Sequence, residues 1–246
     1  MKLSVIVPVY NEESSVHEVL ERVKAVPFEK EVIVVDDGST DGTTEVLRRE
    51  DTDPLVTVIR SPVNFGKGAA VRIGLSYVTG DVVIIQDADL ELDPEEYPEL
   101  VSPILRGETD VVYGSRFLRG RGQSSWRTYV ANRLLALAVN VLYGAHLTDE
   151  ATAYKVFRTH VVRGLPLRAI GFELCPELTA KLLRSGHHIV EVPVAYRPRT
   201  PAEGKKVSYL RDGLQALWTL VRLRFWRPAT VTAPALAPQP TTSAER

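Results

Sequence analysis

The first 120 residues alternate between short apolar runs and segments with helical periodicity, and this alternation limits the possible folds more than any other feature. The strand-like runs are LSVIVPVY, EVIVVDDGS, VTVIR, DVVIIQDAD and DVVYGSRF. The helical segments between them are residues 12–25, 41–50, 67–79 and 94–106. Strands joined by helices of this length form βαβ units. We therefore expect an α/β fold with a mostly parallel central sheet and helices on both faces.

Polar side chains gather where the predicted strands end. They are Asn11, Glu12, Asp36, Asp37, Ser39, Asp87, Asp89, Ser115 and Arg116. Ligands of open α/β sheets bind at the carboxyl ends of the strands. One site built from four strand ends is therefore the simplest interpretation of these polar residues.

The segment DVVIIQDADLELDP, residues 81–94, carries carboxylates at alternate positions after an apolar strand. On an extended chain, Asp87, Asp89 and Glu91 would share one face and repel one another unless a cation lay between them. Mg²⁺ and Mn²⁺ prefer such oxygen ligands. The sequence therefore predicts a divalent metal site at Asp87 and Asp89, whereas Asp93, next to a proline, is expected to cap the following helix.

Two glycine-containing segments follow other predicted strands. VVDDGSTDGT has glycines for tight turns and carboxylates that can accept hydrogen bonds from a ribose or a base. NFGKGAAVRIG places glycine at a helix start, where backbone N–H groups favour phosphate, although it lacks the spacing of a P-loop or a dinucleotide fingerprint. Taken alone, the first segment is equally well explained as an ordinary corner between a strand and a helix.

The charge is divided unequally along the chain. Residues 1–110 hold 10 Lys and Arg against 23 Asp and Glu, and residues 111–246 hold 20 against 8. An acidic half suits cations, and a basic half suits phosphates or an anionic membrane surface. We expect no nucleic-acid partner. The single Cys175 excludes a disulfide framework, and neither a signal-peptide pattern nor an apolar run of 18 residues is present, so a cytoplasmic location is expected.

Five motifs together resemble glycosyltransferase family 2 in their order and approximate spacing: IVPVYNEE, VVDDGSTDGT, NFGKGAAVRIGL, DADLELDP and YGSRF. Within that family, the likeness is to the polyprenyl (dolichyl) phosphate mannosyl- and glucosyltransferases, through Gly-Lys-Gly, DADL, GSRF and the later segments LTDEATAYKVFR and YRPRTPAEGKKVSYLRDG. The resemblance covers about residues 3–225. It implies a Rossmann-like GT-A fold, a UDP- or GDP-hexose donor and inversion at the anomeric carbon.

The resemblance also implies roles for individual residues. The implied nucleotide-sugar contacts are Pro8, Tyr10, Glu12, Asp37, Lys67, Asp87 and Asp89. Asp89 would be the principal metal ligand. Relatives more often have Gln at the position of Glu91, so Glu91 is either a third metal ligand or a solvent-facing side chain.

A lipid phosphate acceptor is already an anionic nucleophile, so it needs positive charge rather than a general base. The candidate acceptor-phosphate cations are Arg116, Arg127, Arg133, Arg197, Arg199, Lys205 and Lys206. Asp149 leaves two interpretations open. In the first, which we favour, Asp149 orients a phosphate-binding arginine or caps a turn; in the second, Asp149 or Glu150 is the base for a soluble or protein-linked hydroxyl acceptor.

We expect one catalytic domain over residues 1–227. It would consist of a nucleotide-sugar and metal half (1–118), an acceptor half (119–206) and an amphipathic helix (207–227), followed by a disordered tail (228–246). The helix is predicted either to lie at the inner face of a membrane, as a peripheral contact, or to pack on the domain. The predicted function is metal-dependent, inverting transfer of glucose or mannose to a polyprenyl phosphate.

Overall fold

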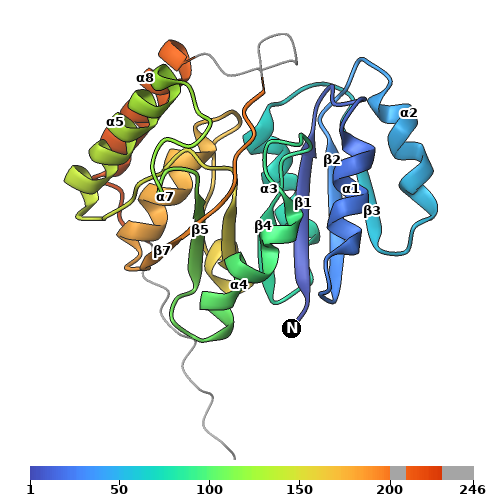
Figure 1. The fold of residues 1–246 in the computed structure, drawn as a ribbon, viewed down its shortest axis with the longest axis horizontal. Helices are drawn as coiled ribbons and strands as arrows, with labels where there is room; N and C mark the ends of the chain where they lie inside the picture. Colours follow the sequence, from blue (N-terminus) through green and yellow to red (C-terminus); the bar gives the residue numbers. More distant parts are fainter. Residues whose placement is uncertain (200–208, 229–246) are drawn as a thin grey trace, which may run out of the picture.

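The computed structural model describes residues 1–199 and 209–228 (Figure 1). These residues form a seven-stranded sheet in the order β3-β2-β1-β4-β6-β5-β7. The strands are β1 (Leu3–Val9), β2 (Lys30–Asp36), β3 (Val56–Arg60), β4 (Val82–Ile85), β5 (Val111–Ser115), β6 (Lys155–Arg158) and β7 (Ile189–Pro193). β6 runs antiparallel to β4 and β5, and the other pairs are parallel. The expected mostly parallel α/β sheet is confirmed.

Helices cover both faces of the sheet, as expected. They are α1 (Val16–Ala25), α2 (Thr43–Leu47), α3 (Lys67–Tyr77), α4 (Tyr97–Leu105), α5 (Trp126–Tyr143), α6 (Thr159–Arg163), α7 (Leu174–Arg184) and α8 (Tyr209–Leu223), with 3₁₀ turns η1 (Arg48–Thr52) and η2 (Pro94–Glu96). One hydrophobic cluster contains residues of α1, α2 and α4. A second cluster contains residues of α3, α5, α6, α7 and α8.

The central strands are apolar throughout because they are covered on both sides. All seven residues of β1 are buried. Val5 and Val7 belong to the first cluster, and Ile6 between them belongs to the second. Successive strand side chains point to opposite faces, so a strand between two helical layers needs an unbroken apolar run.

Several boundaries differ from the sequence prediction. The first helix begins at Val16 rather than at residue 12. The predicted helices 41–50 and 94–106 are each divided into an α-helix and a 3₁₀ turn. Asp93 accepts a hydrogen bond from the Glu95 N–H at 3.1 Å and caps η2, so the predicted cap is confirmed. α6 and the antiparallel direction of β6 were not predicted.

The C-terminal helix packs beside α5 and α7 (Figure 1). The Tyr143 hydroxyl on α5 donates to the Leu220 carbonyl at 2.6 Å, and the Arg184 Nε donates to the Trp226 carbonyl at 3.0 Å. No helix in the described ranges combines the length and the apolar character needed to cross a membrane. Apart from Pro228, the predicted disordered tail lies outside the described residues.

Candidate active site

A cavity of about 690 Å³ lies where β1, β2 and β4 end. All the nucleotide-sugar candidates line it: Pro8, Tyr10, Glu12, Asp37, Lys67, Asp87 and Asp89. Its lining continues to apolar residues of α5 and α8, namely Leu134, Leu135, Leu214, Ala216 and Leu217. One continuous space therefore joins the polar ends of the strands to the apolar surfaces of two helices.

Three carboxylates in this cavity surround one guanidinium, that of Arg199. Arg199 Nη1 donates to Glu12 Oε1 and Oε2 at 3.1 and 2.9 Å, and Nη2 donates to Asp89 Oδ2 at 2.6 Å. Arg199 Nε lies 3.8 Å from Glu91 Oε1. The Arg199 backbone N–H donates to the same Glu91 oxygen at 2.8 Å. Arg199 was predicted to bind the acceptor phosphate; in the structure it contacts Asp89 and Glu91, two of the predicted metal ligands, and Glu12, which was predicted as a nucleotide-sugar contact.

The carboxylate cluster fits a divalent cation. Asp89 is 6% exposed. Burial and the charge of Asp87 raise the pKa of Asp89 to about 7, against the opposing charge of Arg199. The neighbouring carboxylate charges that raise this pKa are charges that a cation between them would offset. The guanidinium is a cation standing among oxygen ligands suited to Mg²⁺ or Mn²⁺, so Glu12, Asp89 and Glu91 are suited to hold such an ion.

The alternating carboxylates do not share one partner, contrary to the extended arrangement that we expected. β4 ends at Ile85, and the chain bends between residues 88 and 92. Asp87 pairs with Lys67, with Nζ 2.5 Å from Oδ1. The bend thus separates Asp87, which pairs with the first residue of α3, from Asp89 and Glu91, which face Arg199.

Asp37 fixes the glycine-rich turn before α3. Its carboxylate accepts hydrogen bonds from the N–H groups of Phe65 and Gly66, at 2.9 and 2.7 Å. Gly66 has φ +103°, and a Cβ there would lie 2.4 Å from the Ile170 carbonyl oxygen. Glycine is therefore required at this position by both the backbone conformation and the close approach of a second segment.

Arg116 is another cation of the cavity, and Asp149 determines its orientation. Arg116 Nε lies 2.7 Å from Asp149 Oδ2, and Nη2 lies 2.8 Å from Oδ1. The Arg116 Nη2 also donates to Asn132 Oδ1 at 3.3 Å. Burial would lower the pKa of Arg116, but the Asp149 charge outweighs it and raises that pKa. The arginine is therefore held charged at the wall of the cavity, 5.0 Å from the Tyr196 ring centre.

The two candidate bases are both completely buried. Asp149 is engaged by Arg116 through both oxygens, which fits the orienting role that we favoured. Burial raises the pKa of Glu150, and its Oε1 accepts a 3.3 Å hydrogen bond from Thr179. Among the described residues, the Glu150 Oε2 has no hydrogen-bond partner.

The other predicted acceptor cations are not brought to the cavity. Arg127, Arg133 and Arg197 are exposed and are absent from its lining, and Arg133 Nη1 donates to the Thr148 carbonyl at 3.3 Å. Lys205 and Lys206 lie outside the described residues. Of the predicted acceptor-phosphate cations that the structure describes, Arg116 and Arg199 line the cavity.

Several residues that line the cavity were not predicted from the sequence. Asn132, Tyr196, Phe172 and Cys175 all line the space. Asn132 is one of several polar residues of α5, which also contains Arg127, Arg133 and Asn140, so the sequence did not single it out. The aromatic residues carried no signal, because an exposed aromatic side chain and a cavity-lining one look the same in a sequence.

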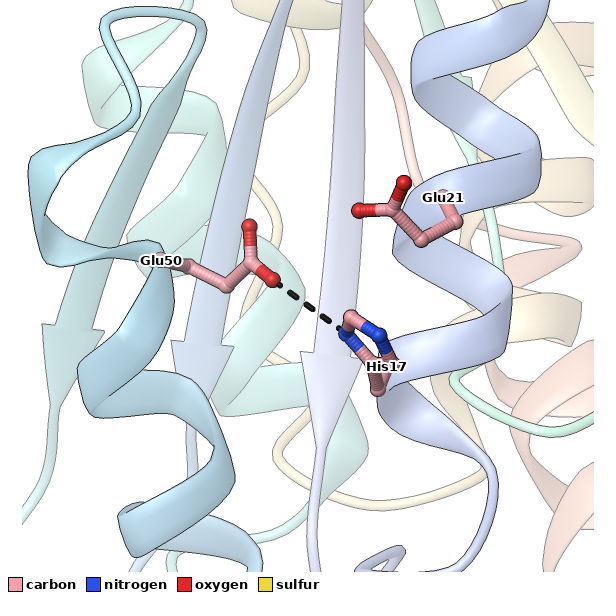
Figure 2. Close-up of side chains that lie close together, drawn as sticks. All are labelled: His17, Glu21 and Glu50. Atoms are coloured by element: carbon pink, nitrogen blue, oxygen red, sulfur yellow. Dashed lines mark ion pairs between the residues drawn. The ribbon is translucent and has the colours of Figure 1, made fainter.

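A histidine and two glutamates meet away from this cavity. Figure 2 shows His17 and Glu21 of α1 with Glu50 of η1, and one ligand atom of each lies within 4.8 Å of the others. His17 Nδ1 is 3.5 Å from Glu50 Oε1. Lys24 already bridges both glutamates, at 2.5 Å from Glu21 and 3.0 Å from Glu50. Lys24 of α1 therefore already supplies a positive charge to Glu21 and Glu50.

The sequence is similar to those of known proteins that belong to one family. The pattern of "Glycosyl transferase family 2" matches residues 4–165. A dolichol-phosphate mannosyltransferase of Pyrococcus furiosus is 33% identical over 232 residues, covering 90% of this chain and 64% of the relative. An undecaprenyl-phosphate mannosyltransferase of Micrococcus luteus is 31% identical over 244 residues, covering 91% of this chain and 99% of the relative. The chain thus spans less than two thirds of the Pyrococcus protein and nearly all of the Micrococcus protein.

Solved structures show the same fold. Glucosyl-3-phosphoglycerate synthase from Mycobacterium tuberculosis, in complex with Mn²⁺, UDP and phosphoglyceric acid, has a TM-score of 0.70 at 24% identity, over 93% of this chain and 80% of that one. Its complex with Mg²⁺ and UDP gives 0.69 at 25% identity, over 93% and 81%. The expected Rossmann-like GT-A fold is confirmed. With the family pattern matching more than half of its residues, this chain belongs to glycosyl transferase family 2.

Proposed function

We propose that this protein transfers a hexose, glucose or mannose, from a nucleoside diphosphate to a polyprenyl phosphate. In this reaction the bond between the sugar C1 and the β-phosphate oxygen breaks, and the nucleoside diphosphate leaves with that electron pair. A lipid phosphate oxygen attacks C1 from the opposite side and forms the new bond with inversion. No proton has to be removed, because the attacking phosphate is already an anion.

The continuous cavity is the observation that carries this proposal. Its polar end contains Asp89 and Lys67, and its other end contains Leu134, Leu214 and Leu217. Leu134 and Leu214 are each 61% exposed. A water-soluble acceptor gains nothing from such a surface, whereas a phosphate attached to an isoprenoid chain needs polar and apolar walls in one space.

The proposed donor side follows from charge and hydrogen bonding. Pro8, Tyr10 and Asp37 would line the nucleoside, with Lys67 and Asp87 close to the ribose or the diphosphate. Glu12, Asp89 and Glu91 would hold Mg²⁺ or Mn²⁺. When bound, that ion would neutralise the diphosphate and stabilise the leaving group.

The proposed acceptor side depends on Arg116. Its guanidinium is buried and charged, it is fixed by Asp149, and it lines the same cavity as the carboxylate cluster. An arginine fork matches phosphate oxygens in both geometry and charge. A fixed cation at this place would bind the lipid phosphate and orient its oxygen toward C1.

The domain arrangement that we propose places the donor half at residues 1–118, the acceptor half at 119–206 and the amphipathic helix at 207–227. Exposed apolar residues lie on α5 (Leu137 and Val141), on α8 (Trp218) and just after α8 (Phe225). A helix with one apolar face and flanking arginines suits the boundary between lipid and water. We therefore propose peripheral contact with the inner face of a membrane, where a lipid acceptor is available.

Transfer of labelled sugar from a panel of UDP- and GDP-hexoses tests the function. The assay is run with Mn²⁺, with Mg²⁺ or with EDTA, and with or without a polyprenyl phosphate in detergent. Label that enters the organic phase only with metal and lipid supports the proposal and names the donor. Label that reaches a soluble hydroxyl acceptor instead supports a family member that uses Asp149 or Glu150 as base.

Two variants sharpen this assay. Asp89→Asn should abolish lipid labelling, because it removes a carboxylate from the carboxylate cluster. Asp110→Asn is the matched control, since Asp110 is a partly exposed carboxylate that pairs with Arg158 and is absent from the cavity lining. Equal loss of activity in both variants would contradict the assignment of the cluster.

A further inference from the structure

The guanidinium of Arg199 takes the place in which the carboxylate cluster would hold a divalent ion. Its two terminal nitrogens contact Glu12 and Asp89, and its Nε is nearest to Glu91. The side chains of Arg199, Glu12 and Asp89 are 21%, 11% and 8% exposed. The three carboxylates that contact Arg199 are therefore the same ones that would bind the divalent ion of the proposed reaction.

The guanidinium of Arg199 and a divalent ion cannot both lie between these carboxylates. Like charges a few ångströms apart repel strongly in a partly buried site, where the effective dielectric constant is well below that of water. Arginine does not lose its proton in proteins, so Arg199 cannot leave the cluster by becoming neutral. Its side chain has to move for an ion to bind between Asp89 and Glu12.

The backbone at Arg199 is held by hydrogen bonds that do not involve its guanidinium. The Arg199 N–H is held by Glu91 Oε1 at 2.8 Å, and the Arg197 N–H is held by the Glu91 carbonyl at 2.9 Å. Within the described part of the chain, the buried Arg199 Nε has no hydrogen-bond acceptor. This Nε–H group could therefore donate to another acceptor, such as a phosphate oxygen.

We propose that Arg199 is a resident counter-ion that the divalent metal displaces, and that the displaced guanidinium then binds a phosphate in the same cavity. This inference rests on the proposed function, because it takes Glu12, Asp89 and Glu91 as the metal ligands. Metal binding and phosphate binding are then coupled through one side chain. A metal ion that binds alone competes with Arg199 for the carboxylates. When metal and phosphate bind together, the carboxylates hold the ion and the phosphate binds the guanidinium.

Binding of Mn²⁺, followed by the electron paramagnetic resonance signal of the free ion, tests this coupling without any sugar transfer. Without nucleotide, Arg199→Gln should bind Mn²⁺ on the order of tenfold more tightly than the unaltered protein, within the usual range of coupling between two sites. Arg197→Gln is the matched control, because it removes the same charge from an exposed neighbour. It should leave the affinity unchanged.

Addition of a phosphate ligand completes the test. UDP or GDP, and separately a polyprenyl phosphate in detergent, should increase the Mn²⁺ affinity of the unaltered protein more than that of Arg199→Gln. The ligand that shows this difference is the one that receives the guanidinium. Equal increases in both proteins would overturn the second half of the proposal.

Further variants keep the outcome interpretable. Adding Asp89→Asn to Arg199→Gln should remove the gained affinity, which locates the ion. If Arg199→Gln does not fold, Arg199→Lys replaces it: one ammonium cannot bridge Glu12 and Asp89 as a fork does, so its affinity should be intermediate. An Arg199→Gln protein that binds Mn²⁺ no more tightly than the unaltered one overturns the proposal. These affinities can hold in a protein that labels no lipid, so the two proposals fail separately.

Discussion

Asp149 holds Arg116 by three hydrogen bonds, from Nε at 2.7 Å, from Nη2 at 2.8 Å and from the backbone N–H at 3.0 Å. Asp149 is in turn fixed by Glu191, which accepts its backbone N–H at 2.9 Å. Glu191 also accepts the Thr148 N–H and hydroxyl, each at 2.8 Å. The carboxylate that orients the arginine is thus itself held by a second carboxylate, on β7.

Asp149→Asn should therefore weaken acceptor binding more than donor binding. The amide leaves a buried, charged Arg116 without its counter-ion, and breaking a buried ion pair from one side costs about 3–5 kcal/mol of stability. We expect a higher KM for the polyprenyl phosphate, an unchanged Kd for the nucleotide and a lower melting temperature. Steady-state kinetics, nucleotide titration and thermal unfolding measure these three quantities.

A double-mutant cycle separates positioning from general-base catalysis. If Asp149 acts through Arg116, the effects of Asp149→Asn and Arg116→Lys on kcat/KM will not be additive. Additive effects, together with a loss of kcat at unchanged acceptor KM, would instead identify Asp149 as a base. Asp110→Asn provides the control for stability, since its pair with Arg158 is partly exposed and should contribute less than about 1 kcal/mol.

Gly66→Ala should disrupt the junction between the glycine-rich turn and the 170–171 segment. The added Cβ would meet the Ile170 carbonyl oxygen at 2.4 Å, in a backbone conformation that alanine rarely adopts. Strained conformations of this kind cost about 1–3 kcal/mol before any clash is counted. We expect a loss of stability beyond that range, measured by denaturant unfolding, together with weaker nucleotide binding.

Gly107→Ala is the matched control for that experiment. Gly107 also has a positive φ, +72°, but a Cβ there meets nothing within 4 Å. The difference between the two variants therefore isolates the close approach of the 170–171 segment. Equal losses in the two variants would show that only the backbone conformation matters at Gly66.

The fold was predictable because its signals are local. Each strand of the first half is an apolar run that ends in polar residues, and the resulting strand-end site gathers Glu12, Asp37 and Asp89 as expected. Gly144 ends α5 with φ +69°, the left-handed conformation that glycine commonly adopts after a helix. These features depend on neighbours within a few positions, so composition and spacing are enough to find them.

The position of Arg199 was not predictable from such signals. Its partner Asp89 is 110 residues away along the chain, and the sequence showed only a basic segment and a separate acidic one. The expected extended conformation of residues 87–91 was wrong for a related reason, since tertiary contacts with Lys67 and Arg199 accompany the bend there. The direction of β6 likewise depends on which strands it lies between, and periodicity does not reveal that.

Stability at acidic pH should depend on Glu31. Burial would raise the pKa of Glu31, but hydrogen bonds from Lys2, Ser4 and Thr79 outweigh it and lower the pKa from 4.5 to about 2. A lowered carboxyl pKa stabilises the folded state above the unfolded pKa, and this stabilisation is lost as the pH falls through the folded pKa. The shift corresponds to a contribution on the order of 3 kcal/mol at neutral pH.

Glu31→Gln should therefore be less stable than the unaltered protein at pH 7, and the difference should shrink between about pH 4.5 and pH 2. Urea unfolding at a series of pH values measures it. Glu45→Gln is the control, because Glu45 is an exposed carboxylate whose ion pair with Arg48 is open to solvent. A difference for Glu31→Gln that stays constant with pH would show that the side chain acts through packing rather than charge.

The exposed apolar residues of the α8 region should determine membrane association. Trp218 and Phe225 are 60% and 80% exposed and do not line the cavity, so replacing them leaves the proposed site intact. The pair Trp218→Ser and Phe225→Ser should lower binding to anionic phosphatidylglycerol vesicles by at least about tenfold, since each buried aromatic side chain contributes about 1.5–3 kcal/mol. Co-sedimentation at two salt concentrations measures the binding.

Replacement of a second pair of exposed apolar residues is the control for this experiment. Tyr77→Ser and Leu105→Ser change side chains that are 50% and 54% exposed on α3 and α4, away from α8, and should leave vesicle binding unchanged. Salt weakens only attraction between charges, so the part of binding that survives high salt and disappears in the α8 variant is the apolar contact. If both pairs reduce binding equally, the vesicles are recognising general hydrophobicity and α8 is a packing helix. If neither does, attraction to the arginines carries the whole interaction.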